Sequence, residues 1–198
     1  MDTGSNARAG RYVKQLTGYS AFVPAPLPPD PPIDNGQFSK LLSDADRALG
    51  RLDGVASMLP NPDLFVAMYV KHEAVLSSQI EGTQSTLEDV LEFEAGKKGT
   101  ADPEDLEEVV NYVKAMNHGR SRLESGFPLS LRIIREIHSI LLYGVRGGWK
   151  APGDFRTTQN WLGPAGSTLQ NANYIPPAPV DMMVALDNLE RFLHERDT

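Results

Sequence analysis

The chain has 198 residues, enough for one domain of ordinary size or two small ones that share a core. Its formal net charge is −7 and it contains no cysteine, which excludes a disulfide framework, a thiolate zinc site and a cysteine nucleophile. A duplex-binding surface normally carries the opposite charge, so we expect no DNA contact. The N-terminus lacks the apolar core of a signal peptide, and no run reaches transmembrane length. We therefore expect a cytoplasmic protein with no membrane partner.

Residues 1–36 are expected to form an N-terminal arm that ends in a proline-rich strap. The run PAPLPPDPP, from Pro24 to Pro32, is too dense in proline for a helix and favours an extended polyproline II conformation. Two interpretations stay open. The segment packs on its own domain, which is the commoner role of an ordered surface segment, or it is a ligand for an aromatic groove of another protein.

Helical periodicity begins at Gln37, and residues 37–100 are predicted to form an N-terminal helical domain. Apolar residues of the first predicted helix line one face: Phe38, Leu41, Leu42, Ala45, Leu49, Leu52 and Ala56. The next helix is expected to start with Asn61 as its cap and Pro62 at its first position, and to end at Gly82.

Two capping patterns follow along the chain. The stretch from Ser85 to Glu88 predicts a capping box for a short acidic helix that continues to about Ala95. Asp102 followed by Pro103 predicts the cap and first position of a further helix, whose first turns are crowded with acidic residues that suit the helix dipole.

Residues 101–198 are predicted to form a third region with a long connection. One helix is expected from Ser130 to Gly144, and the last begins near Val180. Residues 145–179 lack a helical pattern, and so long a connection usually carries function. Two extended pieces, FRTTQNWL and NANYIPP, flank a Gly/Pro/Ser tip and predict a β-hairpin. The fold class is therefore all-α with one small β element.

The titratable residues show no catalytic or metal-binding spacing. His72 and Glu73 begin like a zinc-protease motif, but Leu76 stands where the second histidine ligand is needed. The four histidines lack ligand spacing, and a hydrogen-bonded structural role is the more frequent one for His138 in its apolar helix. We therefore expect no metal site.

Ser77 and Glu81 are four residues apart, so they share a helix face. Glu81 lies in the last turn, where the exposed carbonyls make a carboxylate unfavourable by roughly 0.3–1 kcal/mol. The commoner explanation is a solvated surface glutamate, because such costs are small. The other is a carboxylate held out to meet a cation, most simply an arginine, from another segment.

Several stretches together resemble bacterial Fic (Fic/DOC) family proteins with an inhibitory helix before the Fic core. They are AFVPAPLPP, ALGRLDGVASMLPNPDLFVAMYVKHEAVLSSQIEGTQSTLEDVL, IIREIHSILLYGVRG and PGDFRTTQNWLG followed by NANYIPPAP. The resemblance covers nearly all of the chain from Tyr19 onward.

The resemblance implies an enzyme that transfers AMP from ATP to a hydroxyl side chain of a target protein, with Mg²⁺ on the phosphates. The family's inhibitory motif matches Ser77, Glu81 and Gly82, and its glutamate pairs with an arginine of the catalytic loop and blocks the position that the ATP γ-phosphate needs. The predicted hairpin matches the family's flap, which docks the target protein by strand addition. Its candidate docking residues are Thr157, Thr158, Gln159, Asn160, Tyr174 and Ile175.

One departure from the family pattern limits these expectations. The family's catalytic loop begins His-Pro-Phe, and this sequence contains no His-Pro pair. We therefore expect a Fic-type helical fold that is C-terminally incomplete, with no catalytic residue in this chain. ATP and Mg²⁺ would serve the parent enzyme and would not bind this chain tightly.

The residues leave two alternatives to autoinhibited AMP transfer open. The chain could act as a non-catalytic module that supplies its inhibitory helix or flap to a partner, or it could form a homo-oligomer that covers apolar surface left exposed. A transcription-associated role through a winged-helix domain, which some relatives carry, has no support in these residues.

Overall fold

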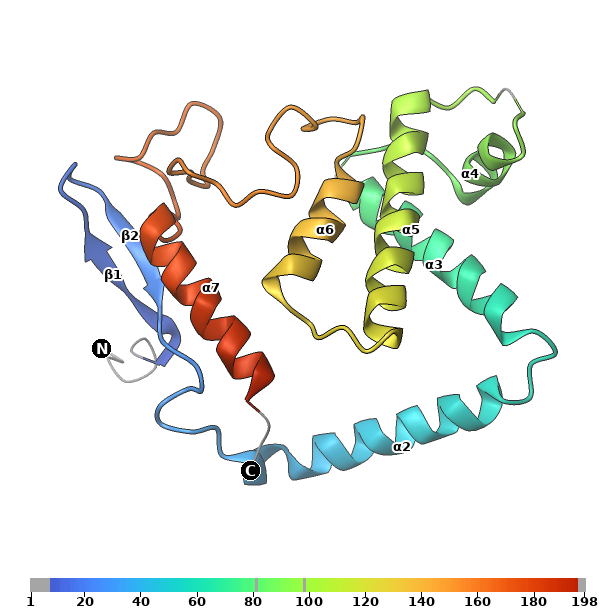
Figure 1. Ribbon diagram of the computed structural model, residues 1–198, viewed down its shortest axis with the longest axis horizontal. Helices are drawn as coiled ribbons and strands as arrows, with labels where there is room; N and C mark the ends of the chain where they lie inside the picture. The colour runs from blue at the N-terminus through green and yellow to red at the C-terminus, as the bar shows by residue number, and fades with distance from the viewer. Residues whose placement is uncertain (1–7, 81, 98, 196–198) are drawn as a thin grey trace. The chain divides into compact units, whose positions relative to one another are not determined.

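A computed structural model describes residues 8–80, 82–97 and 99–195. The fold is mostly helical with a small antiparallel hairpin, so the predicted all-α class with one small β element is confirmed (Figure 1). The chain divides into two compact units, each treated separately below. Unit 1 comprises residues 1–35, 129–131 and 155–198, and unit 2 comprises residues 36–128 and 132–154. None of the helices in the described ranges is both long and apolar enough to cross a bilayer.

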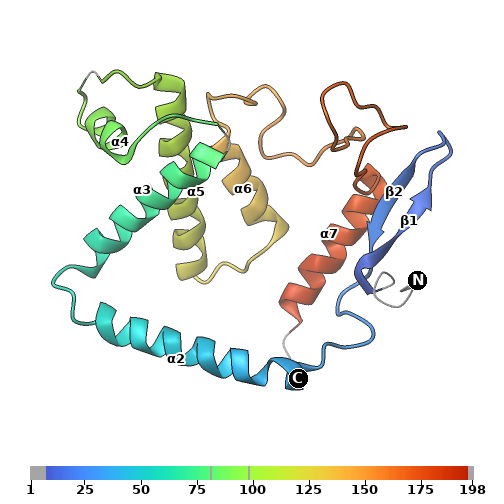
Figure 2. The same cartoon turned by 180° about the vertical axis from the view of Figure 1, so that it is seen from behind.

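Unit 2 is built around three helices that share a small apolar core. Helices α3 (Pro62–Ile80), α4 (Leu87–Glu94) and α5 (Pro103–Glu124) contact one another, and α6 (Leu131–Leu141) lies beside α5 (Figures 1 and 2). The core consists of buried residues from α3, α4 and α5: Ala74, Val75, Val90, Leu106 and Val109. Helix α5 therefore supports the end of α3, which carries the predicted inhibitory motif.

Most helix starts follow the local signals in the sequence. The Leu64 N–H donates to Asn61 Oδ1 at 3.0 Å, and the Glu104 N–H donates to Asp102 Oδ1 at 2.9 Å. Both predicted caps, each followed by proline at the first helical position, are thus confirmed.

The predicted capping box of α4 is wrong by one residue. The structure uses Thr86 as the N-cap and Asp89 as its partner: the Asp89 N–H donates to Thr86 Oγ1 at 3.2 Å, and the Thr86 N–H donates to Asp89 Oδ2 at 2.9 Å. Thr86 Oγ1 also donates to Asp89 Oδ2 at 2.5 Å, and this bond, followed by the bond from the Thr86 N–H, lowers the pKa of Asp89. Ser85 is instead buried, and its carbonyl accepts a bond from the Gln79 side chain at 3.0 Å. Two adjacent hydroxyl residues fit the same motif, and tertiary burial decides between them.

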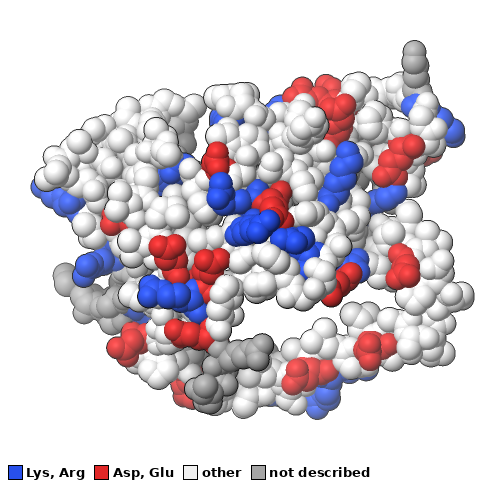
Figure 3. Space-filling view, in the orientation of Figure 1, with Lys and Arg blue, Asp and Glu red and all other residues white. Residues whose placement is uncertain are grey.

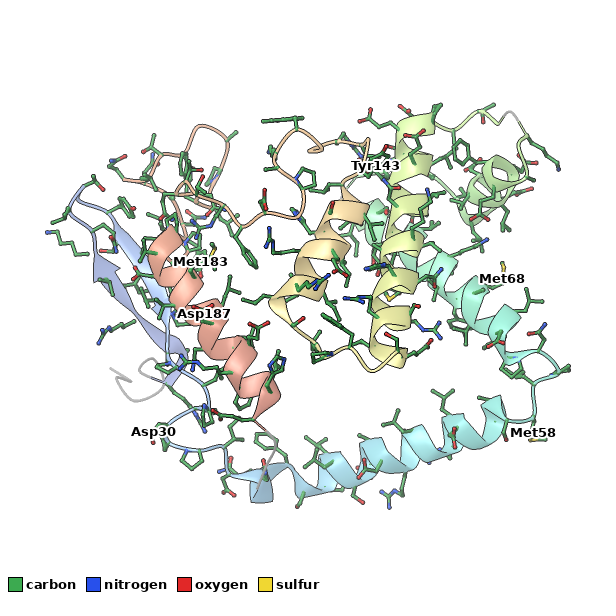
Figure 4. The ribbon with its side chains drawn as sticks, in the orientation of Figure 1. Asp30, Met58, Met68, Tyr143, Met183 and Asp187 are labelled. Carbon is green, nitrogen blue, oxygen red and sulfur yellow. The ribbon has the colours of Figure 1, made fainter. Side chains whose placement is uncertain are left out.

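Helix α2 (Ser39–Ala56) forms as expected, after a short 3₁₀ turn at Asn35–Phe38, but none of its residues is buried. The apolar face predicted from the sequence is open, with Leu49 and Leu52 each more than 60% exposed. Met58, in the turn that joins α2 to α3, is also exposed (Figure 4).

Unit 1 contains a hairpin that the sequence did not predict. Strands β1 (Gly10–Lys14) and β2 (Ser20–Pro24) are antiparallel, with Gly10 opposite Pro24 and Tyr12 opposite Phe22. Helix α7 (Pro179–His194) contacts β2 and begins one residue before the predicted Val180. No residue of α7 is buried.

The proline-rich segment packs on α7. The Leu27 N–H donates to Asn188 Oδ1 at 2.6 Å, and Asn188 Nδ2 donates to the Leu27 carbonyl at 3.2 Å. These contacts support the strap interpretation. The chain bends at residues 27–28 and 30–31, so the predicted continuous polyproline II run is wrong. The strap is anchored through its backbone, which an asparagine side chain can pair on both sides.

Candidate functional site

The end of α3, which carries the predicted inhibitory motif, is closed by a Schellman motif. The Gly82 N–H donates to the Gln79 carbonyl and the Thr83 N–H to the Ser78 carbonyl, both at 3.1 Å. Gly82 has a φ of +105°, a conformation that glycine adopts without steric cost. Gly82 therefore ends the helix as predicted. Glu81, the proposed inhibitory residue, lies outside the described residues.

The segment after Gly82 is fixed to the rest of unit 2. Thr83 and Ser85 are each only 1% exposed. The Gln84 N–H donates to Asp105 Oδ2 on α5 at 3.0 Å. The Gln79 side chain, on α3, donates to the Ser85 carbonyl. The segment after Gly82 is therefore bonded both to the end of α3 and to α5.

Ser77 lies on the last turns of α3, beside a cavity of about 500 Å³. Its Oγ donates to Glu73 Oε1, one turn earlier, at 3.0 Å. The lining comes from α3, α5 and the segment after α6: Ser77, Ser78, Glu108, Tyr112, Leu141, Leu142, Val145 and Arg146. The structure thus places Ser77 at the mouth of a cavity that α5 closes on the other side.

Arg146 is the cation of this cavity, and carboxylates of α5 already bind it. Its Nε and Nη2 donate to the two carboxylate oxygens of Glu108 at 2.7 and 2.9 Å, and Nη2 also reaches Asp105 Oδ1 at 3.3 Å. The hydrogen bond from Arg146 to Glu108 is the main reason that the pKa of Arg146 is raised. The sequence does not reveal this cluster, because acidic residues in the first two turns of a helix are already explained by the helix dipole.

A second bond joins α5 to the segment after α6. Asn111 is 5% exposed, and its Nδ2 donates to the Tyr143 carbonyl at 2.7 Å. Tyr143 lies just past α6, and its ring is exposed (Figure 4). The wall of the cavity opposite α3 is therefore tied to α5 at two points, through Asn111 and through Arg146.

The described residues contain no group of three or more histidine, aspartate or glutamate residues that could hold a metal ion. Arg146 is paired with Glu108 and Asp105, so its charge is already balanced within unit 2.

The predicted flap, residues 155–177, is a loop with one β-bridge instead of a full hairpin. Leu162 and Tyr174 pair in both directions, with N–H to carbonyl distances of 2.8 and 3.1 Å. The Gln159 side chain joins the two limbs by donating to the Pro176 carbonyl at 3.0 Å. Gly163 and Pro164, which follow the bridge, lead into a tip that cannot extend a regular ladder.

The six candidate docking residues of the flap occupy different environments. Thr157, Thr158 and Asn160 are exposed, whereas Gln159 and Tyr174 are half-buried. Ile175 is only 5% exposed, and its carbonyl accepts the Phe22 N–H at 2.8 Å. The limb that contains Tyr174 and Ile175 is thus supported by β2, and the limb at residues 157–160 faces solvent.

A comparison with known families identifies the class of protein. Residues 39–121 match the family model described as Fic/DOC family N-terminal, a region that includes the core of unit 2 and the motif at the end of α3. This match supports the resemblance to Fic family proteins that the sequence predicts. No match was found among curated proteins.

Proposed function

We propose that this chain provides the regulatory and target-docking parts of a protein AMP-transfer system. In that reaction a target hydroxyl oxygen bonds to the α-phosphorus of ATP, pyrophosphate leaves, and the hydroxyl proton is lost. The match to the Fic family model supports AMP transfer in general. The observation that carries the regulatory assignment is the Schellman end of α3, because it holds Ser77 and Gly82, the neighbours of Glu81 in the motif, in a fixed geometry.

Glu81 is the proposed inhibitory carboxylate. A carboxylate at a helix C-terminus lacks stabilisation from its own helix, so an arginine from another segment would be its natural partner. That pairing would place the carboxylate where the ATP γ-phosphate must bind. Arg146 is not proposed as this partner, since Glu108 already occupies its guanidinium in a two-bond arrangement.

The test uses a polypeptide that joins this chain to a Fic core with the His-Pro-Phe loop. Self-labelling with ATP labelled at the α-phosphate and Mg²⁺ should rise in Glu81→Gly and in Glu81→Gln, which keeps the side-chain shape but removes the charge. Glu88→Gln is the matched control, because Glu88 is an exposed glutamate close by in α4. Equal labelling in Glu81→Gln and Glu88→Gln would remove the inhibitory assignment.

The isolated chain is expected to transfer no AMP, because its sequence contains no His-Pro pair from which a catalytic loop could start. Incubation with labelled ATP, Mg²⁺ and a cell lysate should leave every protein unlabelled. Label that appears only when the chain is added would refute this expectation.

The flap is proposed to dock the target by strand addition along its outer limb. Within the described part of the chain, no hydrogen bond is formed by a backbone N–H of residues 157–161. Unpaired donors on an exposed extended limb can bind an added strand. Asn160→Pro would remove one unpaired donor and should weaken target labelling. Gln170→Pro is the control: it removes only the bond from the Gln170 N–H to Thr168 Oγ1 in the flap tip and should leave labelling unchanged.

A non-catalytic module is the second candidate function. The observation that favours it is that the sequence carries the motif at α3 and the flap but no His-Pro pair. Adding this chain in trans to a Fic core that lacks an inhibitory helix separates the two roles. A loss of labelling that depends on Glu81 would support the module, and unchanged labelling would count against it.

A further inference from the structure

The segment just before the flap is folded back onto α6 by two side chains. The Gly153 N–H donates to His138 Nδ1 at 2.9 Å, and Arg135 Nε donates to the Gly153 carbonyl at 2.6 Å. Arg135 Nη2 also donates to Asp154 Oδ1 at 2.6 Å. Both backbone groups of one glycine are thus paired with residues one turn apart on a single helix.

The geometry at Gly153 strongly favours glycine. Its φ is +87°, and a Cβ placed there would lie 3.1 Å from Ser139 Cβ and 3.2 Å from the Arg135 carbonyl oxygen. The backbone therefore approaches α6 more closely than any side chain allows. Asp154 is the last residue of unit 2, and Phe155 begins the segment of unit 1 that forms the flap.

His138 has a defined chemical state in this arrangement. Its Nδ1 accepts a bond from a backbone N–H, so the ring is neutral and its proton is on Nε2. Oppositely charged side chains are interspersed over the α5–α6 region (Figure 3). Arg135 and Asp154 form one ion pair of this region. An acceptor at the Nδ1 position is thus the specific requirement at residue 138.

We propose that His138, with Arg135, is a positioning residue that anchors the start of the flap. The anchor holds residues 153–154 on α6, and so fixes where the chain leaves unit 2 to enter the flap. This role rests on the proposed docking function of the flap. The anchor itself is a property of the chain that can be measured without AMP transfer.

Two isosteric substitutions test the anchor. In His138→Asn the amide oxygen occupies the Nδ1 position, whereas in His138→Gln the polar end reaches only the Nε2 position. Loss of this partly buried hydrogen bond should raise the hydrogen-exchange rate of the Gly153 amide about tenfold in His138→Gln, with faster exchange at Asp154, whose N–H donates to the Ala151 carbonyl at 3.0 Å. His138→Asn should restore the wild-type rates, and amides of α5 should be unaffected in both.

A second pair of variants reaches the same contact from the other side. Gly153→Ala should release the anchor through its contacts with Ser139 and Arg135. Gly126→Ala controls for backbone strain, because Gly126 has a φ of +82° with no atom within 4 Å of an added Cβ. Equal exchange at Gly153 and Asp154 in His138→Gln and His138→Asn would overturn the proposal. Since the readout involves no ATP, that failure would leave the AMP-transfer proposal standing, and a failed labelling experiment would leave the anchor standing.

Discussion

Gly82→Ala tests the Schellman motif that ends α3. An added Cβ at Gly82 meets no atom within 4 Å, so the substitution changes only the backbone preference. Gly54→Ala in α2 is the matched control, because its added Cβ also meets no atom within 4 Å, yet its φ lies in the ordinary helical range. The two variants thus differ in backbone conformation and not in packing.

The expected magnitudes have opposite signs. Alanine at a positive φ costs about 1–2 kcal/mol, offset by about 0.4–1 kcal/mol from the lower entropy of the unfolded chain. Gly82→Ala should therefore lower the free energy of unfolding by about 0.5–1 kcal/mol. Gly54→Ala should stabilise α2 by about 0.5–1 kcal/mol, since glycine in a helix interior is unfavourable by that amount.

Urea unfolding followed by far-ultraviolet circular dichroism measures both effects, and hydrogen exchange at Thr83 locates the first. The Thr83 amide should exchange faster in Gly82→Ala, because its bond to the Ser78 carbonyl depends on the left-handed residue between them. Asparagine tolerates positive φ better than alanine, so the free energy of unfolding of Gly82→Asn should lie between those of wild type and Gly82→Ala. Stabilisation by Gly82→Ala equal to that by Gly54→Ala would show that the motif does not form.

Three further substitutions test the surroundings of the site. Asn111→Ala should lower the free energy of unfolding by about 1–3 kcal/mol in a urea titration, because it leaves the Tyr143 carbonyl without its buried donor. The pKa of Glu136 is lowered, mainly by its hydrogen bond to His118. The ionised Glu136 therefore stabilises the folded state above the ordinary carboxyl pKa of about 4.3, and this stabilisation is lost as the pH falls through the lower folded-state pKa. Wild type should therefore lose stability more steeply than Glu136→Gln below about pH 4.3, and parallel curves would contradict this. Leu49→Glu should change the free energy of unfolding by less than about 0.5 kcal/mol, because Leu49 is 62% exposed. It should reduce self-association in sedimentation if the apolar face of α2 forms the contact. Undiminished association would assign any oligomer to a surface other than α2.

The helix ends could be predicted because their signals are local. Asn61 and Asp102 cap helices with the prolines that follow them, and Gly82 ends α3, since each signal involves atoms within a few residues. The capping box of α4 was misplaced by one residue where burial of Ser85 selects Thr86 instead. Local chemistry limits the possible caps, and tertiary contacts choose among them.

Features that depend on distant partners could not be predicted. The periodic apolar face of α2 is correct as a pattern, but periodicity does not show whether a partner covers that face, and none of its residues is buried. The β1–β2 hairpin contains Gly18 at its turn and alternates only weakly, so the sequence indicated an arm. The sequence predicts a hairpin between FRTTQNWL and NANYIPP, and the structure pairs these two pieces through a single bridge, Leu162 with Tyr174.

The surroundings of Glu81 show why a mildly unfavourable residue can indicate a function. Sequence physics alone leaves a surface role as the commoner explanation for a carboxylate at a helix end. The structure adds that the following backbone is buried and bonded to Asp105, so this helix end is held in one position by α5. A helix end that only faced solvent would not need such support, whereas a carboxylate that must meet a cation at a fixed place would. The test is therefore whether the charge at position 81 matters more than the charge at Glu88, which is exposed.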